Sequence, residues 1–248
     1  MIIVANWKAY VSDAAQAKKL VAFAKRLAST TKIKLVLAPS APHAALLALG
    51  NRSKVAFAAQ DISPATDGAS TGESTAQTYA RAGVTYAIIG HSERRAQGET
   101  DADITEKVRR ALAQGLIPIV CVGERERDAS AEYLAFIRAE LAAVLTPLSH
   151  KERLGLIVAY EPIWAIGKSA VEAISGNDLA EMVLYIRKVL GEYLPHKAPA
   201  HVPVLYGGSV EPGNVRELAA ASRVDGFLVG RASVDPVSFA GLVKALRA

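Results

Sequence analysis

Eight times along this chain, a short apolar run is followed by a segment with helical periodicity. Most of the runs are almost continuously apolar, which is typical of strands that are buried on both faces of a parallel sheet. The runs predict strands at residues 2–7, 33–38, 55–60, 85–90, 116–122, 155–161, 202–206 and 225–229. This alternation leaves few architectures open.

The segments between the strands carry the apolar stripe of amphipathic helices. The clearest stripe has apolar residues at helical spacing at Leu179, Met182, Val183, Ile186, Val189 and Leu190. The last helix is expected to begin at Asp235 as N-cap, with Pro236 in its first turn. We therefore expect one helix after each strand.

Eight such units favour a closed barrel. Division of the 248 residues by eight gives about 31 residues per unit, the size of one βα repeat with its loops. No Pro/Ser-rich linker interrupts the series, so we expect one domain over residues 1–248. An open doubly wound sheet is the alternative, but it would more often carry a glycine-rich turn after the first strand, where this chain has Asn6-Trp7-Lys8. The prediction is an α/β fold, a closed (β/α)8 barrel.

Charge and cysteine content exclude several functional classes. The 29 basic and 24 acidic residues are scattered, so the net charge of +5 indicates a mixed solvated surface and no nucleic-acid site. One cysteine cannot form an internal disulfide, and no Cys-x-x-Cys pair suggests a metal. The start of the chain does not resemble a secretory signal, and prolines interrupt the longest charge-free stretch, residues 35–51. We expect a soluble cytoplasmic protein with no membrane contact.

Polar residues at the carboxyl ends of barrel strands are the candidates for chemistry. Glu161 ends an apolar run and suits a general base, although a carboxylate at a barrel rim also commonly forms an ion pair. His91 follows a strand and starts a helical turn, where a neutral imidazole can donate to a substrate oxygen. Asn6 and Lys8 follow the first strand, and the lysine could stabilise an oxyanion. Each residue alone is also compatible with a structural role.

Two glycine-containing turns follow the last two strands. Gly207-Gly208-Ser209 and Gly230-Arg231 can present backbone N–H groups to a phosphate, the usual arrangement at this end of such barrels. Gly167-Lys168-Ser169 resembles part of a P-loop, but the required glycine five residues earlier is Pro162. The sequence thus points to a phosphate site without a nucleotide-binding motif.

Six segments together resemble the triosephosphate isomerase family over essentially the whole chain. They are Asn6-Trp7-Lys8, Gly68-Ala69-Ser70-Thr71-Gly72-Glu73, Ile88-Ile89-Gly90-His91-Ser92-Glu93-Arg94-Arg95, Val120-Cys121-Val122-Gly123-Glu124, Ala159-Tyr160-Glu161-Pro162-Ile163-Trp164-Ala165-Ile166-Gly167 and Tyr206-Gly207-Gly208-Ser209-Val210. The resemblance implies a TIM barrel. It also implies the cofactor-free interconversion of dihydroxyacetone phosphate and D-glyceraldehyde 3-phosphate through an enediolate, a step of glycolysis and gluconeogenesis.

The resemblance also implies roles for individual residues. Glu161 would be the base, His91 would polarise the carbonyl, and Lys8 with Asn6 would stabilise the enediolate. The backbone N–H groups that would bind the phosphate belong to Gly167, Ser209, Gly230 and Arg231.

The resemblance to the family also implies roles for two further segments. Residues 162–170 would form a lid over the substrate. The stretch 61–73 resembles a loop that docks into a second subunit, with Thr71 near the partner's active site, which implies a homodimer.

Three departures from the family pattern leave alternatives open. Ala9-Tyr10 replaces the usual Met-Asn, Lys168-Ser169-Ala170 lacks the usual Thr-Gly pair, and Arg231 replaces a second glycine. A different lid and an added side chain near the phosphate would suit a four-carbon ketose phosphate such as an erythrulose phosphate. A non-catalytic phosphosugar-binding barrel is the alternative from another class, and joint retention of Lys8, His91 and Glu161 opposes it. A phosphosugar lyase would need a Schiff-base lysine inside a strand, and the predicted strands carry lysines only at their edges.

Overall fold

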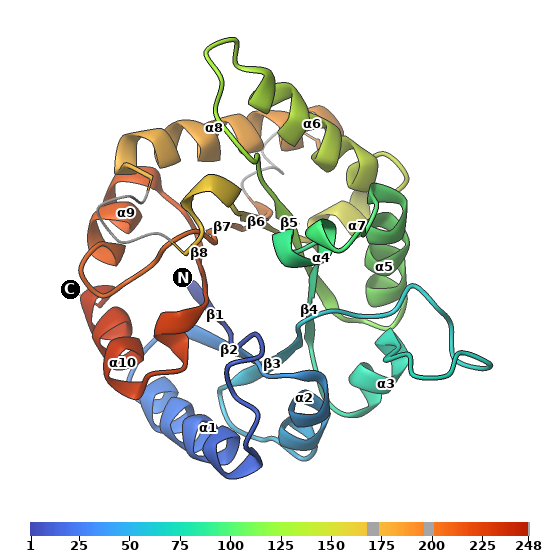
Figure 1. Ribbon diagram of the computed structural model, residues 1–248, viewed down its shortest axis with the longest axis vertical. Coiled ribbons are helices and arrows are strands. Elements are labelled where there is room, and N and C mark those ends of the chain that lie inside the picture. The colour runs from blue at the N-terminus through green and yellow to red at the C-terminus, as the bar shows by residue number, and fades with distance from the viewer. Residues whose placement is uncertain (168–173, 196–200, 248) are drawn as a thin grey trace.

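The structure is a computed structural model that describes residues 1–167, 174–195 and 201–247. Eight parallel strands form a closed barrel in which each strand pairs with the next, and β8 pairs with β1 (Figure 1). The strands are β1 (Ile2–Asn6), β2 (Lys34–Ala38), β3 (Ala56–Ala59), β4 (Tyr86–Ile89), β5 (Ile117–Val122), β6 (Ile157–Tyr160), β7 (Val204–Tyr206) and β8 (Gly226–Val229). The prediction of a closed (β/α)8 barrel is confirmed.

The helices surround the barrel as an outer ring (Figure 1). They are α1 (Ala14–Ser29), α2 (Ala41–Ala48), α3 (Ala76–Arg81), α4 (Ser92–Ala96), α5 (Asp101–Ala113), α6 (Glu132–Leu145), α7 (His150–Leu154), α8 (Gly176–Tyr193), α9 (Val215–Ser222) and α10 (Pro236–Ala245), with short 3₁₀ turns η1 (Ile163–Ala165) and η3 (Arg231–Ser233). None of the helices in the described ranges is both long and apolar enough to cross a membrane.

Sequence periodicity located the long helices but neither of two short ones, of which α4 was expected only as a helical turn starting at His91. All six residues of the predicted stripe on α8 are buried, and the Asp235 side chain caps α10 by accepting from the Ser238 amide. The sequence predicts one helix per unit, and the structure has α4 and α7 in addition. Each has five residues and no buried residue, so neither produces an apolar stripe that a sequence could reveal.

Two apolar layers hold the barrel together. Alternate strand residues point into the barrel, so that Val4 lies inside while Ile3 and Ala5 face the helices. The barrel interior is filled by Val4, Val36, Ala38, Ala58, Tyr86, Ile88, Ile119, Cys121, Ile157, Ala159, Leu205 and Leu228. Because side chains fill the interior, a ligand site has to lie at an end of the barrel.

A long loop between β3 and α3 projects away from the barrel (Figure 1, lower right). Residues 66–69 and 71–73 at its tip are exposed. At its base, Asp61 accepts from the Lys107 ammonium on α5 at 2.7 Å, and Glu99 forms a second ion pair with the same lysine. Lys107 is only 3% exposed, so this buried network fixes the start of the loop on the barrel.

Candidate active site

All eight residues predicted for catalysis and phosphate binding line one pocket at the carboxyl ends of the strands. The pocket has a volume of about 580 Å³, and these residues are Asn6, Lys8, His91, Glu161, Gly167, Ser209, Gly230 and Arg231. They come from the ends of five strands, β1, β4, β6, β7 and β8, that are far apart in the chain. The barrel therefore brings together what the sequence only suggested one residue at a time.

Glu161 and His91 face each other inside this pocket. Glu161 follows β6 directly and is 2% exposed, and its Oε1 lies 3.3 Å from Nε2 of His91. Its other oxygen, Oε2, accepts from the backbone N–H of Ser92 at 3.3 Å. Gly90, with a φ of 73°, makes the turn between β4 and α4 that points His91 at the carboxylate. A carboxylate and an imidazole thus meet where a small substrate can reach both.

Hydrogen bonding defines the protonation of the imidazole. His91 is the N-cap of α4, and its Nδ1 accepts from the backbone N–H of Glu93 at 3.1 Å. Since an accepting ring nitrogen carries no proton, the proton of the neutral ring lies on Nε2. The pocket therefore contains a neutral N–H donor beside the Glu161 carboxylate.

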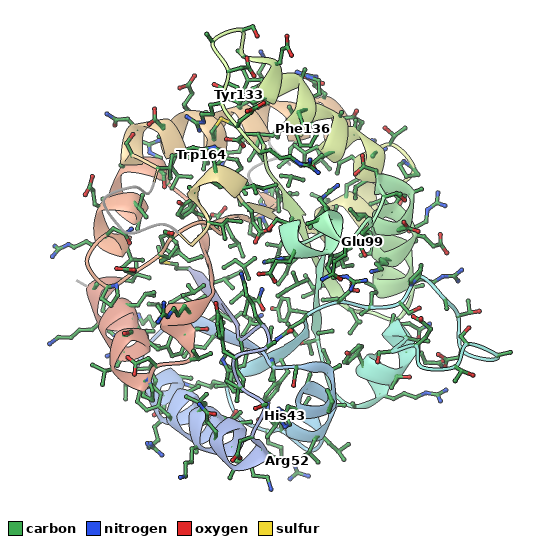
Figure 2. The ribbon with its side chains drawn as sticks, viewed as in Figure 1. His43, Arg52, Glu99, Tyr133, Phe136 and Trp164 are labelled. Atoms are coloured by element: carbon green, nitrogen blue, oxygen red, sulfur yellow. The ribbon has the colours of Figure 1, made fainter. Side chains whose placement is uncertain are left out.

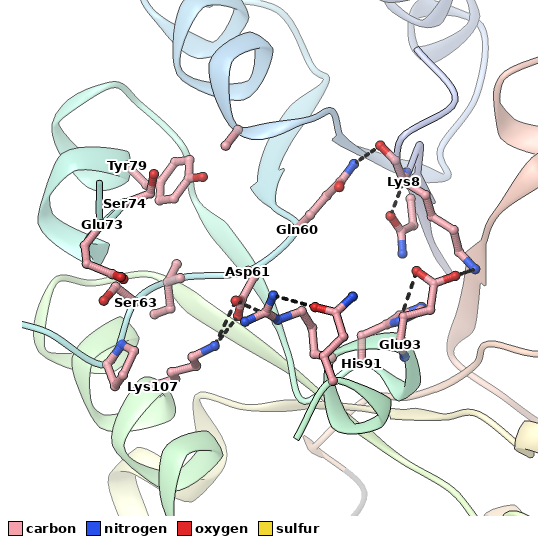
Figure 3. Close-up of a pocket in the computed structure, with 16 residues that line it drawn as sticks. Lys8, Gln60, Asp61, Ser63, Glu73, Ser74, Tyr79, His91, Glu93 and Lys107 are labelled. Carbon is pink, nitrogen blue, oxygen red and sulfur yellow. Dashed lines mark hydrogen bonds and ion pairs between the residues drawn. The ribbon is translucent and has the colours of Figure 1, made fainter. Parts of the chain in front are cut away.

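Lys8 reaches the pocket from an uncommon backbone conformation. Its φ is 45°, in the left-handed region that residues other than glycine rarely adopt. The Asn6 side chain accepts from the Lys8 amide at 3.1 Å, and the Gln60 side chain donates to the Lys8 carbonyl at 2.8 Å. The ammonium forms an ion pair with Glu93 at 2.8 Å (Figure 3). The bonds from Asn6 and Gln60 offset the backbone strain at Lys8, and together with the ion pair they hold the Lys8 ammonium at the pocket that His91 also lines.

Glycines leave the space that the Glu161 side chain occupies. A Cβ at Gly207, which follows β7, would lie 2.8 Å from Cγ of Glu161. A Cβ at Gly123 would lie 1.9 Å from the Glu161 carbonyl oxygen. Cys121 lies beneath Glu161 in the barrel, and burial, with the nearby Glu161 charge, raises the pKa of its thiol well above the ordinary value. The carboxylate thus sits on a closely fitted and apolar floor.

The other side of the pocket is made of backbone from the last two units and from the segment after β6. Gly167 has a φ of 73° and ends the described part of the predicted lid. The Ser209 hydroxyl donates to the Ala165 carbonyl at 2.9 Å and ties the loop after β7 to η1. Gly230 and Arg231 lead into η3. This side of the pocket carries the turns that the sequence predicts to bind a phosphate.

A cluster next to the lid joins the ends of β5 and β6. Oε1 of the buried Glu124 accepts from the Tyr160 hydroxyl at 2.8 Å and from Nε1 of Trp164 at 2.8 Å. Arg127 lies beside the same oxygen, with Nε at 3.2 Å. Burial and the Glu124 charge raise the pKa of Tyr160, so its hydroxyl stays protonated and donates.

The three departures from the family pattern fall in different places. Tyr10 lies at the rim of the pocket and is 55% exposed. Arg231 also lines the pocket and is exposed. Lys168-Ser169-Ala170 lie outside the described residues, so the second half of the predicted lid is not part of this description.

Gln60 and Glu124 are the residues that sequence reasoning missed. Gln60 ends the predicted strand 55–60, and its amide donates to the carbonyls of Lys8 and Ala38. A polar residue at a strand end was the available signal. Glu124 is the last residue of the segment 120–124 that resembles the family, but its role was not visible in the sequence because its partners Tyr160 and Trp164 are 36 and 40 residues away. The part of the chain that the structure describes contains no group of three His, Cys, Asp or Glu side chains placed to hold a metal ion.

Known proteins match this chain over nearly its whole length. A family model described as triosephosphate isomerase matches residues 1–246. A triosephosphate isomerase of Moorella thermoacetica is 41% identical over 98% of this chain and 97% of its own length. Those of Symbiobacterium thermophilum and Rhodopirellula baltica are 38% and 34% identical, over 98% and 99% of this chain and 96% and 97% of their own lengths. The chain therefore belongs to the triosephosphate isomerase family.

Proposed function

We propose that Glu161 and His91 carry out the proton transfers by which this enzyme interconverts dihydroxyacetone phosphate and D-glyceraldehyde 3-phosphate, and that Lys8 and Asn6 stabilise the enediolate between them. The protein is a triose-phosphate isomerase, an aldose–ketose isomerase of glycolysis and gluconeogenesis. The observation that carries the assignment of roles is the 3.3 Å approach of Glu161 Oε1 to His91 Nε2 in a pocket that Lys8 and Asn6 also line.

The reaction needs one base, one donor and a place for negative charge. The Glu161 carboxylate takes a proton from the carbon next to the carbonyl, and the carbonyl oxygen becomes the oxyanion of an enediolate. The Nε2–H of His91 gives its proton to this oxyanion, and Nε2 then takes the proton of the neighbouring hydroxyl, so that the two oxygens exchange roles while the Lys8 ammonium stabilises their charge. Glu161 then returns the proton to the neighbouring carbon, so that the substrate is isomerised without a cofactor.

Lys8 changes partner during this cycle. Without substrate, its ammonium is paired with Glu93, whose side chain is 57% exposed. A solvent-exposed ion pair contributes little free energy, so an enediolate in the pocket can compete for the ammonium. Asn6 holds the Lys8 amide and so keeps the side chain at the pocket.

The phosphate binds at the opposite side of the pocket. The backbone N–H groups of Gly167, Ser209, Gly230 and Arg231 are the proposed donors. Closure of the lid that residues 162–170 would form removes water from the enediolate, which otherwise loses its phosphate. The hydrogen bond from the Ser209 hydroxyl to the Ala165 carbonyl supports a role of residues 162–170 as a lid, because it links the proposed phosphate site to this segment.

The enzyme acts as a homodimer through the loop 61–73. A second hollow, of about 490 Å³, adjoins the active site and shares Asn6, Lys8 and His91 with it (Figure 3). The exposed loop tip of a second copy, with Thr71, is the segment that would enter this hollow, because residues 66–69 and 71–73 project from the barrel and leave their side chains exposed. Residues 1–248 act as one catalytic domain, and the enzyme works in the cytoplasm with the rest of glycolysis.

Isomerisation of glyceraldehyde 3-phosphate in D₂O tests the mechanism. A carboxylate base exchanges its proton with solvent, so dihydroxyacetone phosphate carries deuterium on C1, which proton NMR detects. A hydride shift would leave that carbon unlabelled and would contradict the proposal. The relatives all carry the name triosephosphate isomerase, so a four-carbon substrate and a non-catalytic barrel are not favoured.

A further inference from the structure

Two side chains of opposite charge, Arg95 on α4 and Glu140 on α6, lie behind the active site and outside the set of residues that line its pocket. Nη1 of Arg95 lies 3.1 Å from Oε1 of Glu140, and the two side chains are only 15% and 3% exposed. Both line a separate hollow of about 610 Å³, together with Glu99 and Phe136, which Figure 2 labels. This ion pair is therefore close to the catalytic groups but does not touch a substrate between them.

Arg95 holds the backbone that comes immediately before the imidazole. Its Nε donates to the Gly90 carbonyl at 3.0 Å, and Gly90 makes the turn that points His91 into the pocket. The backbone N–H of Arg95 also donates to the His91 carbonyl at 3.1 Å. Asp101, at the start of α5, accepts from Nη1 of Arg95 at 2.7 Å and fixes the guanidinium from outside. The place of the guanidinium thus helps to set the place of the His91 backbone.

Glu140 holds the backbone against which Glu161 packs. Its Oε2 accepts from the backbone N–H of Gly123 at 2.9 Å, in a fully buried contact. Gly123 touches the backbone of Glu161 so closely that an added Cβ would lie 1.9 Å from the Glu161 carbonyl oxygen. The Glu161 amide donates to the carbonyl of Val122, the residue before Gly123, at 2.8 Å. A shift of Gly123 therefore displaces the backbone that carries the base.

The ion pair joins these two supports. A gap too narrow to hold a water molecule is lined by, among others, Gly90, Arg95, Gly123 and Glu161. Because no water fits between them, a displacement passes from one group to the next by direct contact. A guanidinium presents its donors in a rigid planar fork, so the nitrogen that faces Glu140 cannot move without the nitrogen that holds Gly90.

We propose that Arg95 and Glu140 act together as positioning residues that set the separation of the His91 imidazole and the Glu161 carboxylate, which is 3.3 Å between Nε2 and Oε1. This inference deepens the proposed function and rests on the roles it gives to His91 and Glu161. A buried ion pair contributes little net stability compared with apolar side chains of the same volume. Its particular contribution here is geometric, since one pair connects the backbone of the donor with the backbone of the base.

A conservative variant of each partner tests the inference. Arg95→Lys keeps the cation but loses the fork, and Glu140→Gln keeps an acceptor for Gly123 but loses the charge. We expect kcat on glyceraldehyde 3-phosphate to fall about ten- to hundredfold in each, because a displacement approaching about 1 Å has an effect of this size. KM should change by less than about twofold, since the proposed phosphate side of the pocket is untouched. All rates are compared at pH 8, because burial raises the pKa of Glu140 to about 7.

The double variant shows whether the two residues act as one unit. If they do, Arg95→Lys/Glu140→Gln is about as slow as the slower single variant, because either change alone already breaks the connection. Two independent supports would give a loss in kcat equal to the product of the two single losses.

Nitrogen NMR of the imidazoles separates positioning from stability. Among the described residues, Glu140 forms no hydrogen bond or ion pair with His91, so Glu140→Gln shifts the Nε2 resonance of His91 only if the change passes through Arg95. We expect this shift in both single variants, whereas His43 on α2, labelled in Figure 2, keeps its resonance. The signals of His91 are assigned by their loss in His91→Gln.

Two controls on α6 account for lost stability and for a lost arginine. Val144→Ala leaves a cavity under a buried side chain of the same helix and lowers the melting temperature without removing a hydrogen bond. Arg138→Lys alters an exposed ion pair with Glu192. Neither control should change kcat by more than about twofold or shift the His91 resonance.

Several results would overturn the inference. They are a kcat within about threefold of the wild type in both folded single variants, a loss that appears in KM alone, an equal loss of kcat in Val144→Ala, and a multiplicative loss in the double variant. An unchanged His91 resonance in Glu140→Gln would overturn it as well.

Two further cases are decided by other measurements. If neither single variant folds, Asp101→Asn replaces them, because it loosens Arg95 from a carboxylate whose side chain is 44% exposed; an unchanged kcat and an unchanged His91 resonance in this variant overturn the inference. If the wild-type protein isomerises no triose phosphate, the proposed function fails instead, and the His91 resonance of Glu140→Gln decides the positioning role by itself.

Discussion

Gly207→Ala is the perturbation whose effect follows most directly from the geometry. A Cβ at this position would lie 2.8 Å from Cγ of Glu161 and 3.2 Å from its Oε1. Ordinary contacts between carbon atoms are about 3.5–4.0 Å, so the carboxylate has to move by about 1 Å. A shift of this size costs about a hundredfold in rate, which corresponds to about 2.7 kcal/mol of transition-state stabilisation.

The coupled isomerase assay on glyceraldehyde 3-phosphate measures this effect. We expect kcat to fall about a hundredfold while the free energy of unfolding changes by less than about 2 kcal/mol, since alanine tolerates this backbone conformation. Gly213→Ala is the matched control, because no described atom lies within 4 Å of the Cβ position there. If Gly207→Ala kept a kcat within a factor of about three of the control, the tight fit around Glu161 would have no role in catalysis.

Three further variants or measurements test other parts of the structure. Burial raises the pKa of Glu140 to about 7, against the opposing charge of Arg95. Between about pH 4.5 and pH 7 the folded protein therefore binds one proton more than the unfolded chain, and this group lowers the unfolding free energy by up to about 1.4 kcal/mol per pH unit as the pH rises. Glu140→Gln removes that slope in urea unfolding at fixed protein concentration, and equal slopes in the two proteins would refute the assignment. Gln60→Met removes two hydrogen bonds, one of them to the Lys8 carbonyl, and should lower both kcat/KM about tenfold and the unfolding free energy by about 1–2 kcal/mol; unchanged kinetics would show that Lys8 needs no such support. Light scattering should give twice the mass of one chain for the wild type and a lower mass for Thr71→Arg, whereas a stable wild-type monomer would contradict the dimer.

The barrel could be predicted because its signals are local. Each strand is a continuous apolar run and each long helix carries a stripe, as on α8, where all six predicted residues are buried. The ends of the strands were displaced by one or two residues. Glu161, for example, was placed in the predicted strand 155–161, and it lies just after β6. Apolar runs indicate burial, whereas a strand ends where its ladder of hydrogen bonds ends.

The contents of the pocket could be predicted, but not what holds them in place. Strand ends meet at one end of a barrel, so the sequence order alone placed His91 and Glu161 near each other. The support for Lys8 comes from Gln60, 52 residues away, and Arg127 contacts Trp164 across two loops. Such pairs depend on the relative rotation of neighbouring units, which no local pattern encodes.

The turnover of Glu161→Asp compared with that of the wild type tests the central claim most directly. Aspartate keeps the carboxylate but withdraws it by about 1 Å from the imidazole and the substrate carbon, so we expect kcat on glyceraldehyde 3-phosphate to fall at least about a hundredfold. The melting temperature should stay close to that of the wild type. A folded Glu161→Asp variant with near-normal turnover would show that Glu161 is not the base.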